Sequence, residues 1–172
     1  MTGAEEIADR FTGAASGGGL DKPLRNFFER GTIDLQNRAR QHAPVNDGQL
    51  RGAIAHEVDP ASPPAWGAAG VLNALPGSPL LAKAAAMEFG TGLLGEGPGG
   101  KKKRHFPPPA ALEGWAKKHG FRSGWAVAFA IWKKGGLKPR RYMRRAKEEF
   151  EAGTLAGLKR RLLDEIIEVL SG

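Results

Sequence analysis

The chain has 172 residues, of which 41% are hydrophobic, with 25 glycines, 12 prolines and no cysteine. This length supports one well-filled core, the glycine and proline content indicates many turns and loops, and the lack of cysteine excludes disulfides, thiolate zinc sites and a cysteine nucleophile. Neither a signal sequence nor an apolar run of about 20 residues is present, so we expect a soluble protein, intracellular where it is made.

The formal net charge of +8 is concentrated in one region. Residues 101–145 contain 14 Lys and Arg against one acid, a balance of +13, whereas residues 1–100 contain 8 against 11 and residues 146–172 contain 4 against 6. A basic field of this kind favours a polyanion or an acidic partner surface.

The N-terminal region has few apolar anchors and ends in a glycine run, so residues 1–20 are predicted to form a flexible arm or at most a loose first helix. Residues 21–172 are predicted to form a single domain. Asp21 and Pro23 are typical of a helix start, and Pro44 disfavours the helical conformation of the residue before it, so we expect a helix over 22–42.

The stretch that follows has the chemistry of a turn leading into a strand. Asn46, Asp47 and Gly48 favour a turn, and apolar residues at even spacing then predict a strand from Leu50 to Val58. A second strand is expected over 66–72, paired with the first.

Residues 79–89 have the signals of a helix at both ends. Ser78 and Pro79 favour a helix start and Gly90 a helix end, although an extended segment is the alternative. The basic loop 91–106 has too much glycine and like charge for a regular element, and is expected to be flexible.

A helical insertion is predicted over 107–135, with one helix closed by Gly120 and a second that begins after Ser123. The apolar faces are expected to contain Leu112, Trp115 and Ala116 in the first helix and Trp125, Ala128, Phe129 and Trp132 in the second. Helical spacing favours core or subunit-interface packing for these tryptophans, and base stacking is the alternative.

A long amphipathic helix is predicted from Arg140 to about Leu170, with Gly153 and Gly157 as places for a break or bend. Together these elements predict an α+β fold. Its small antiparallel sheet would pack against the N-terminal helix and the long C-terminal helix, with the helical hairpin inserted.

The residues do not suggest an enzyme. No pair of carboxylates is placed for acid–base chemistry, and the four histidines lack HxH or HExxH spacing. These histidines are His42, His56, His105 and His119. We therefore expect no catalytic residues, no metal site and no cofactor. The run Lys101, Lys102, Lys103 and Arg104 is either a solvated part of the loop or a contact for DNA or an acidic partner.

Three separated segments carry a resemblance to a known family. They are APVNDGQLRGAI (43–54), AAAMEFGT (84–91) and LKPRRYMRRA (137–146). In this order they resemble the "aPVdTGrLRxSI", "YAxxvEfGT" and "iPxRPFlRPAl" signatures of the tailed-phage minor tail or tail-completion family related to lambda tail protein Z. The departures are Asn46-Asp47 for Asp-Thr, Ala53 for Ser, Lys83 for Tyr, Lys138-Pro139 for Pro-x, Arg141-Tyr142-Met143 for Pro-Phe-Leu and Arg145 for Pro.

The resemblance implies a structural virion protein at the head–tail junction, assembled in the host cytoplasm as a homo-hexameric ring. It implies as partners the phage connector or stopper and the tail terminator or tail tube proteins, with transient contact to passing DNA and none to a membrane. The motif and interface residues would be Pro44, Gly48, Leu50, Arg51, Glu88, Phe89, Gly90, Thr91, Pro139, Arg140 and Tyr142.

Two alternatives stay open at this stage. A basic DNA-binding protein acting through residues 101–145 is the rival function. For Glu88, opposite charge suggests an ion pair with Arg51 or Arg140, and a solvated carboxylate is the other possibility.

Overall fold

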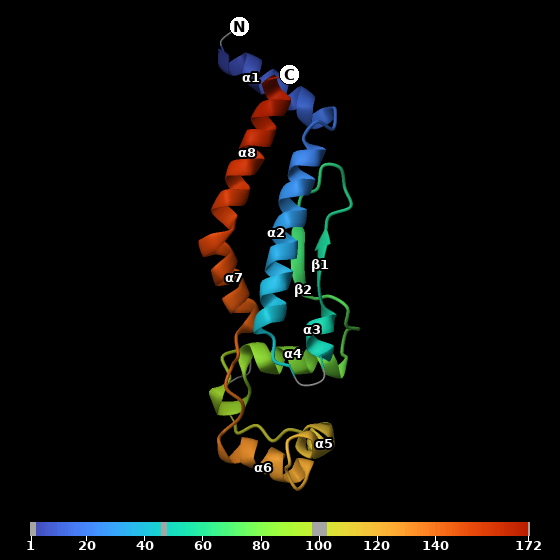
Figure 1. Cartoon of the computed structure of the whole chain (residues 1–172), viewed down its shortest axis with the longest axis vertical. Helices are drawn as coiled ribbons and strands as arrows, with labels where there is room; N and C mark the ends of the chain where they lie inside the picture. Colours follow the sequence, from blue (N-terminus) through green and yellow to red (C-terminus); the bar gives the residue numbers. More distant parts are fainter. Residues whose placement is uncertain (1–2, 46–47, 98–102, 172) are drawn as a thin grey trace. The chain divides into compact units, whose positions relative to one another are not determined.

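The computed structural model describes residues 3–45, 48–97 and 103–171. It is mostly helical with a two-stranded antiparallel sheet, which confirms the predicted α+β class (Figure 1). Its contacts divide the chain into two compact units. Unit 1 comprises Met1–Gln41, Ile54–Leu72 and Arg145–Gly172, and unit 2 comprises His42–Ala53 and Asn73–Arg144.

Unit 1 contains the sheet and the long helices. The segment expected as an arm or a loose helix carries α1 (Gly3–Ser16), and the predicted first long helix is α2 (Asp21–His42). The strands are β1 (Ile54–Val58) and β2 (Gly67–Val71), paired antiparallel with Ile54 opposite Val71. Within this unit α2 lies between the β1–β2 hairpin and the C-terminal helices (Figure 1).

A polar network attaches the sheet to α2. Gln36 donates through Nε2 to the Ile54 carbonyl at 3.1 Å, and Arg40 donates to the same oxygen at 2.7 and 3.0 Å. The Gln36 Oε1 atom lies 2.6 Å from Nδ1 of His56. Gly67 supports this packing, because a Cβ there would lie 2.8 Å from the Thr32 side chain. His56 therefore has a structural place in the hairpin–helix contact.

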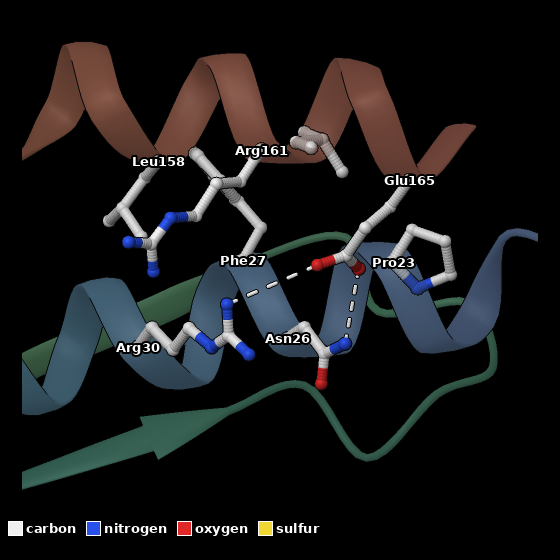
Figure 2. Close-up of a pocket in the computed structure, with 8 residues that line it drawn as sticks. Pro23, Asn26, Phe27, Arg30, Leu158, Arg161 and Glu165 are labelled. Atoms are coloured by element: carbon white, nitrogen blue, oxygen red, sulfur yellow. Dashed lines mark hydrogen bonds and ion pairs between the residues drawn. The ribbon is translucent and has the colours of Figure 1, made fainter. Parts of the chain in front are cut away.

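The other side of α2 contacts α8 (Leu155–Ser171). Glu165 of α8 reaches back to α2, where it accepts a hydrogen bond from Asn26 at 3.1 Å and lies 4.0 Å from Arg30 (Figure 2). Close to the start of α8, Thr154 donates to Asp34 at 2.9 Å and accepts from Arg38 at 3.0 Å. These polar contacts fix the register between the two helices.

Unit 2 is built from short elements. They are α3 (Gln49–Ala53), α4 (Pro79–Phe89), the 3₁₀ helix η1 (Gly92–Leu94), α5 (Pro109–Lys118) and α6 (Gly124–Lys133). The predicted cap signals operate: Ser78 accepts from Leu81 N, and Ser123 accepts from Ala126 N. The helices α5 and α6 pack on each other as the expected hairpin.

The structure differs from the predicted elements at two places and confirms a predicted break at a third. The strand expected from Leu50 begins only at Ile54, because residues 49–53 form α3 and bury Leu50 and Ala53 on one helical face. The long C-terminal helix breaks beside Gly153, one of the two predicted positions, and is divided into α7 (Tyr142–Gly153) and α8. The loop expected to lack regular structure contains η1.

The expected apolar face of α6 was wrong at its aromatic residues, although Ala128 is buried as expected. Its buried residues are Gly124, Val127 and Ala128. The aromatic residues Trp125 and Phe129 are instead 66% and 56% exposed. Gly124 explains the choice of face, because a Cβ there would lie 2.1 Å from the Pro109 carbonyl oxygen, so α6 approaches α5 along its small residues.

Candidate functional site

The second and third motif segments meet at the start of α7. The Glu88 carboxylate, at the end of α4, accepts hydrogen bonds from the backbone N–H groups of Met143 at 2.8 Å and Arg144 at 3.1 Å. The first N–H groups of a helix have no partner within the helix and carry partial positive charge. Glu88, only 9% exposed, therefore caps α7 from a position 55 residues earlier in the chain.

This cap corrects both expectations for Glu88. Within the described parts of the chain, the carboxylate forms no ion pair with Arg51 or Arg140. It is not solvated either, because it is buried. Capping suits the local charge, since Arg144 in the first turn of α7 is unfavourable to the helix dipole and a carboxylate compensates it.

Backbone hydrogen bonds continue the contact between the two segments. Arg140 N donates to Met87 O at 2.7 Å, and Thr91 N donates to Leu137 O at 2.9 Å. The Thr91 hydroxyl accepts from Leu137 N at 3.0 Å. Gly90 lies at the closest approach: its φ is 72°, and a Cβ would lie 2.6 Å from Leu137 O and 2.9 Å from Pro139. No other residue fits there without displacing the backbone.

Tyr142 is the buried anchor of this arrangement, at 2% exposure. Burial, together with the nearby negative charge of Glu88, raises the pKa of Tyr142 to about 12. The phenol therefore stays neutral at physiological pH. Phe89, one of the motif and interface residues that the resemblance implies, is 40% exposed.

A second carboxylate holds the arginines that precede and begin α7. Glu96 forms ion pairs with Arg141 and with Arg144, the latter at 3.4 Å. Arg141 has a φ of 54°, in the left-handed region that a non-glycine residue adopts at a cost. The Glu96 contacts stabilise that backbone conformation.

Residues 43–53 of the first motif segment lie in unit 2 as well. Arg51 of α3 donates through Nε to Ala43 O at 3.2 Å, across the turn that precedes α3. Gly48 has the positive φ that the turn requires, 78°, and Leu50 is buried. Pro44 follows the end of α2 as expected, whereas Asn46 and Asp47 lie outside the described residues.

The predicted basic contact is described only in part, because Lys101 and Lys102 lie outside the described residues. Lys103 and Arg104 are exposed, and Arg104 donates to the carbonyl of Lys133 at 2.9 Å. The Arg104 guanidinium also lies 5.3 Å from the ring centroid of Trp132. The basic loop is thereby attached to the end of α6.

Exposed aromatic side chains continue this surface. Phe129 and Trp132 stack on each other with ring centroids 5.6 Å apart, and Phe106 lies 5.7 Å from Trp125. We call these four residues the aromatic patch. Ring faces turned toward each other, and toward Arg104, are less available for stacking with bases than isolated aromatic rings would be.

The hollows of unit 1 differ greatly in size. The one between α2 and α8, lined by Phe27, Leu158 and Glu165 among others, encloses about 10 Å³ (Figure 2). That is room for roughly one water molecule. An open groove of about 460 Å³ lies between α1 and α8 beside Arg10 and Leu170.

The described residues contain no group of three or more His, Asp or Glu placed to hold a metal ion. Within the same part of the chain, no helix combines the length and the apolar character that crossing a membrane requires.

Comparison with known proteins gave no match to a family model, to a curated protein or to a solved structure.

Sequence reasoning found the motif residues but missed two features. It did not find Glu96 as a partner of Arg141, and it did not find the exposure of Trp125 and Phe129. The exposure of Trp125 and Phe129 could have been predicted from the sequence. Gly124, Val127 and Ala128 are small residues at helical spacing, which is typical of the closely packed face of a helical hairpin.

Proposed function

We propose that this chain is a non-enzymatic structural protein of a tailed-phage virion, a tail-completion component that forms a ring at the junction of head and tail. The observation that carries the proposal is the Glu88 cap, which joins the second motif segment to the third. The motif residues bind one another's backbone, as expected of signatures that specify a structural module.

The proposed setting is the virion neck. Its partners would be further copies of this chain in a homo-hexameric ring, the phage connector or stopper on one side and the tail terminator or tail tube proteins on the other. A ring arises when one heterologous interface repeats and closes. The excess of basic residues over 101–145 supports contact with acidic neighbours, and with passing DNA only transiently.

Electron microscopy of phage particles produced without this chain tests the proposal. We expect separate heads and tails, or tails with an aberrant upper end, and normal virions when the wild-type chain is supplied in trans. Normal, infectious virions in the absence of the chain would contradict the proposal.

DNA binding through residues 101–145 is the second candidate, favoured by the excess of basic residues there, of which Lys103 and Arg104 are exposed. It predicts tight binding of free DNA whose affinity falls steeply with salt. The structural proposal predicts weak binding at physiological salt. An electrophoretic mobility-shift assay with duplex and single-stranded DNA at low and physiological salt separates the two.

A further inference from the structure

Two exposed apolar surfaces of this chain have matching spacing and opposite charge. One is the part of the aromatic patch on α6, where Trp125, Phe129 and Trp132 follow one another at helical spacing. The other is on α8, where Leu163 and Ile167 are 59% and 60% exposed, one turn apart. We call the α8 surface, with Asp164 and Glu168, the C-terminal stripe.

The aromatic patch has a basic border. Arg104 lies over Trp132, and Lys133 and Lys134 follow at the end of α6, all exposed. Between residues 103 and 140 the sequence contains one acid, Glu113, whose carboxylate accepts from Gly124 N at 2.7 Å at the start of α6. The patch is therefore apolar at its centre and positive at its edge.

The C-terminal stripe has the opposite charge. From Leu162 to Ser171 the sequence has three acids and no base, and Asp164 and Glu168 are both exposed beside Leu163 and Ile167. The basic residues of α8 are confined to the preceding turn, at 159–161. Ala126 and Ala130, which border the aromatic patch on α6, are small enough for another helix to approach closely.

We propose that the aromatic patch of one copy binds the C-terminal stripe of a second copy. Apolar side chains would form the centre of this contact and the lysines would face Asp164 and Glu168 at its edge. Because the two surfaces differ, the interface is heterologous and repeats head to tail, as a ring requires. The inference rests on the proposed function, because it identifies the repeated interface that the proposed ring requires.

Charge and shape together favour a second copy of this chain as the occupant of the aromatic patch. A polyanion would satisfy the basic edge, but the ring faces of Trp132 and Phe129 already contact Arg104 and each other. An acidic partner with apolar side chains at helical spacing satisfies the edge and the centre together, and α8 of this chain has both. The second copy is therefore the occupant that the described residues favour.

Cysteine cross-linking tests the contact directly, because the chain contains no cysteine of its own. Phe129→Cys is mixed with Ile167→Cys, one of them carrying a size tag so that the mixed dimer is resolved, and the mixture is oxidised briefly. Since each variant has a single cysteine, a mixed disulfide joins two copies. Both positions are exposed, so both variants are expected to fold.

The matched control is Phe129→Cys mixed with Ile33→Cys, which replaces an exposed residue of α2 outside the stripe. We expect the Phe129–Ile167 pair to give roughly tenfold more mixed dimer than this control, as binding at a specific interface requires. Equal yields from the two pairs would overturn the proposal and leave another protein, or DNA, as the occupant of the patch.

Charge reversal provides a second test. Lys133→Glu with Lys134→Glu in the copy that carries Phe129→Cys should lower the mixed-dimer yield about tenfold. Adding Asp164→Lys with Glu168→Lys to the other copy should restore the yield to within about threefold of its original value. Failure of the reversed pair to restore the yield would remove the charged edge from the proposal.

The interface and the proposed function can fail separately. Separated heads and tails without the chain, together with background cross-linking, would retain the neck function and reject this interface. Normal virions without the chain, together with a specific cross-link, would retain the interface and reject the function.

Discussion

Replacing Glu88 with alanine removes the acceptor of two backbone N–H groups at the start of α7. The bonds measure 2.8 and 3.1 Å, and the carboxylate is 9% exposed. A hydrogen bond to a charged group contributes about 1.5–3 kcal/mol, and water reaches part of an exposed helix end, so we expect Glu88→Ala to lower the unfolding free energy by about 3 kcal/mol. Glu88→Gln keeps one acceptor oxygen and loses the charge, and should cost about half as much.

Guanidinium unfolding followed by tryptophan fluorescence measures this change. In a Trp66→Phe background the remaining tryptophans all lie in unit 2, so the signal reports the unit that contains the cap. Arg122→Ala, at an exposed position of the same unit, is the control and should change the free energy by less than about 0.5 kcal/mol.

Arg140→Ala separates the cap from an ion pair. If Glu88 were stabilised mainly by Arg140, removal of either residue would cost a similar amount. We expect the unfolding free energy of Arg140→Ala to lie within about 1 kcal/mol of that of the background protein. The Arg140 side chain is exposed, and the variant keeps the backbone N–H that donates to Met87 O. A Glu88→Ala protein as stable as the background would refute the reasoning.

Three further predictions concern named groups. Tyr142 is the one tyrosine, so absorbance near 295 nm should titrate with a pKa of about 12 in the folded protein and near 10 in denaturant. Because the folded pKa is the higher one, stability is complete below pH 10 and falls by up to roughly 3 kcal/mol as the pH rises toward 12, a loss that Tyr142→Phe should remove. Gly90→Ala should cost at least about 2 kcal/mol in thermal or denaturant unfolding because of its φ of 72° and its contact with the 137–139 backbone, whereas Gly52→Ala, with open space around it, should be neutral or stabilising. The hydrogen bond from Ser62, and then that from Arg25, lowers the pKa of Asp21, so carboxyl NMR titration should give a pKa below 3.8 that rises in Ser62→Ala.

Helices with capping residues at both ends could be predicted from the sequence. α4 begins after a serine cap with Pro79 and ends before Gly90, and its bounds were predicted without error. The α5–α6 hairpin followed in the same way from Ser123 and Gly120. Local chemistry decided these elements, so little depended on contacts elsewhere in the chain.

Where two periodicities coincide, the sequence could not decide. Leu50 and Ile54 are four residues apart, which suits one face of a strand and also one face of a helix. The helical interpretation holds as far as Ala53, because Leu50 and Ala53 are buried together three residues apart.

The Glu88 cap could not be found by reading local patterns. Its donors, Met143 and Arg144, are 55 and 56 residues away in the sequence. Opposite charge suggested an arginine side chain as the partner of Glu88. Its actual partners are backbone N–H groups at the start of α7, which have no acceptor within the helix. These partners become visible only in the folded chain, where the end of α4 meets the start of α7 through these two hydrogen bonds.

Immunogold labelling of intact virions tests the central claim most directly. Antibody raised against this chain should label the joint between head and tail, and purified tails should carry the label at the head-proximal end or not at all. Label distributed over the capsid or along the tail, or virions free of the chain by quantitative mass spectrometry, would contradict the account.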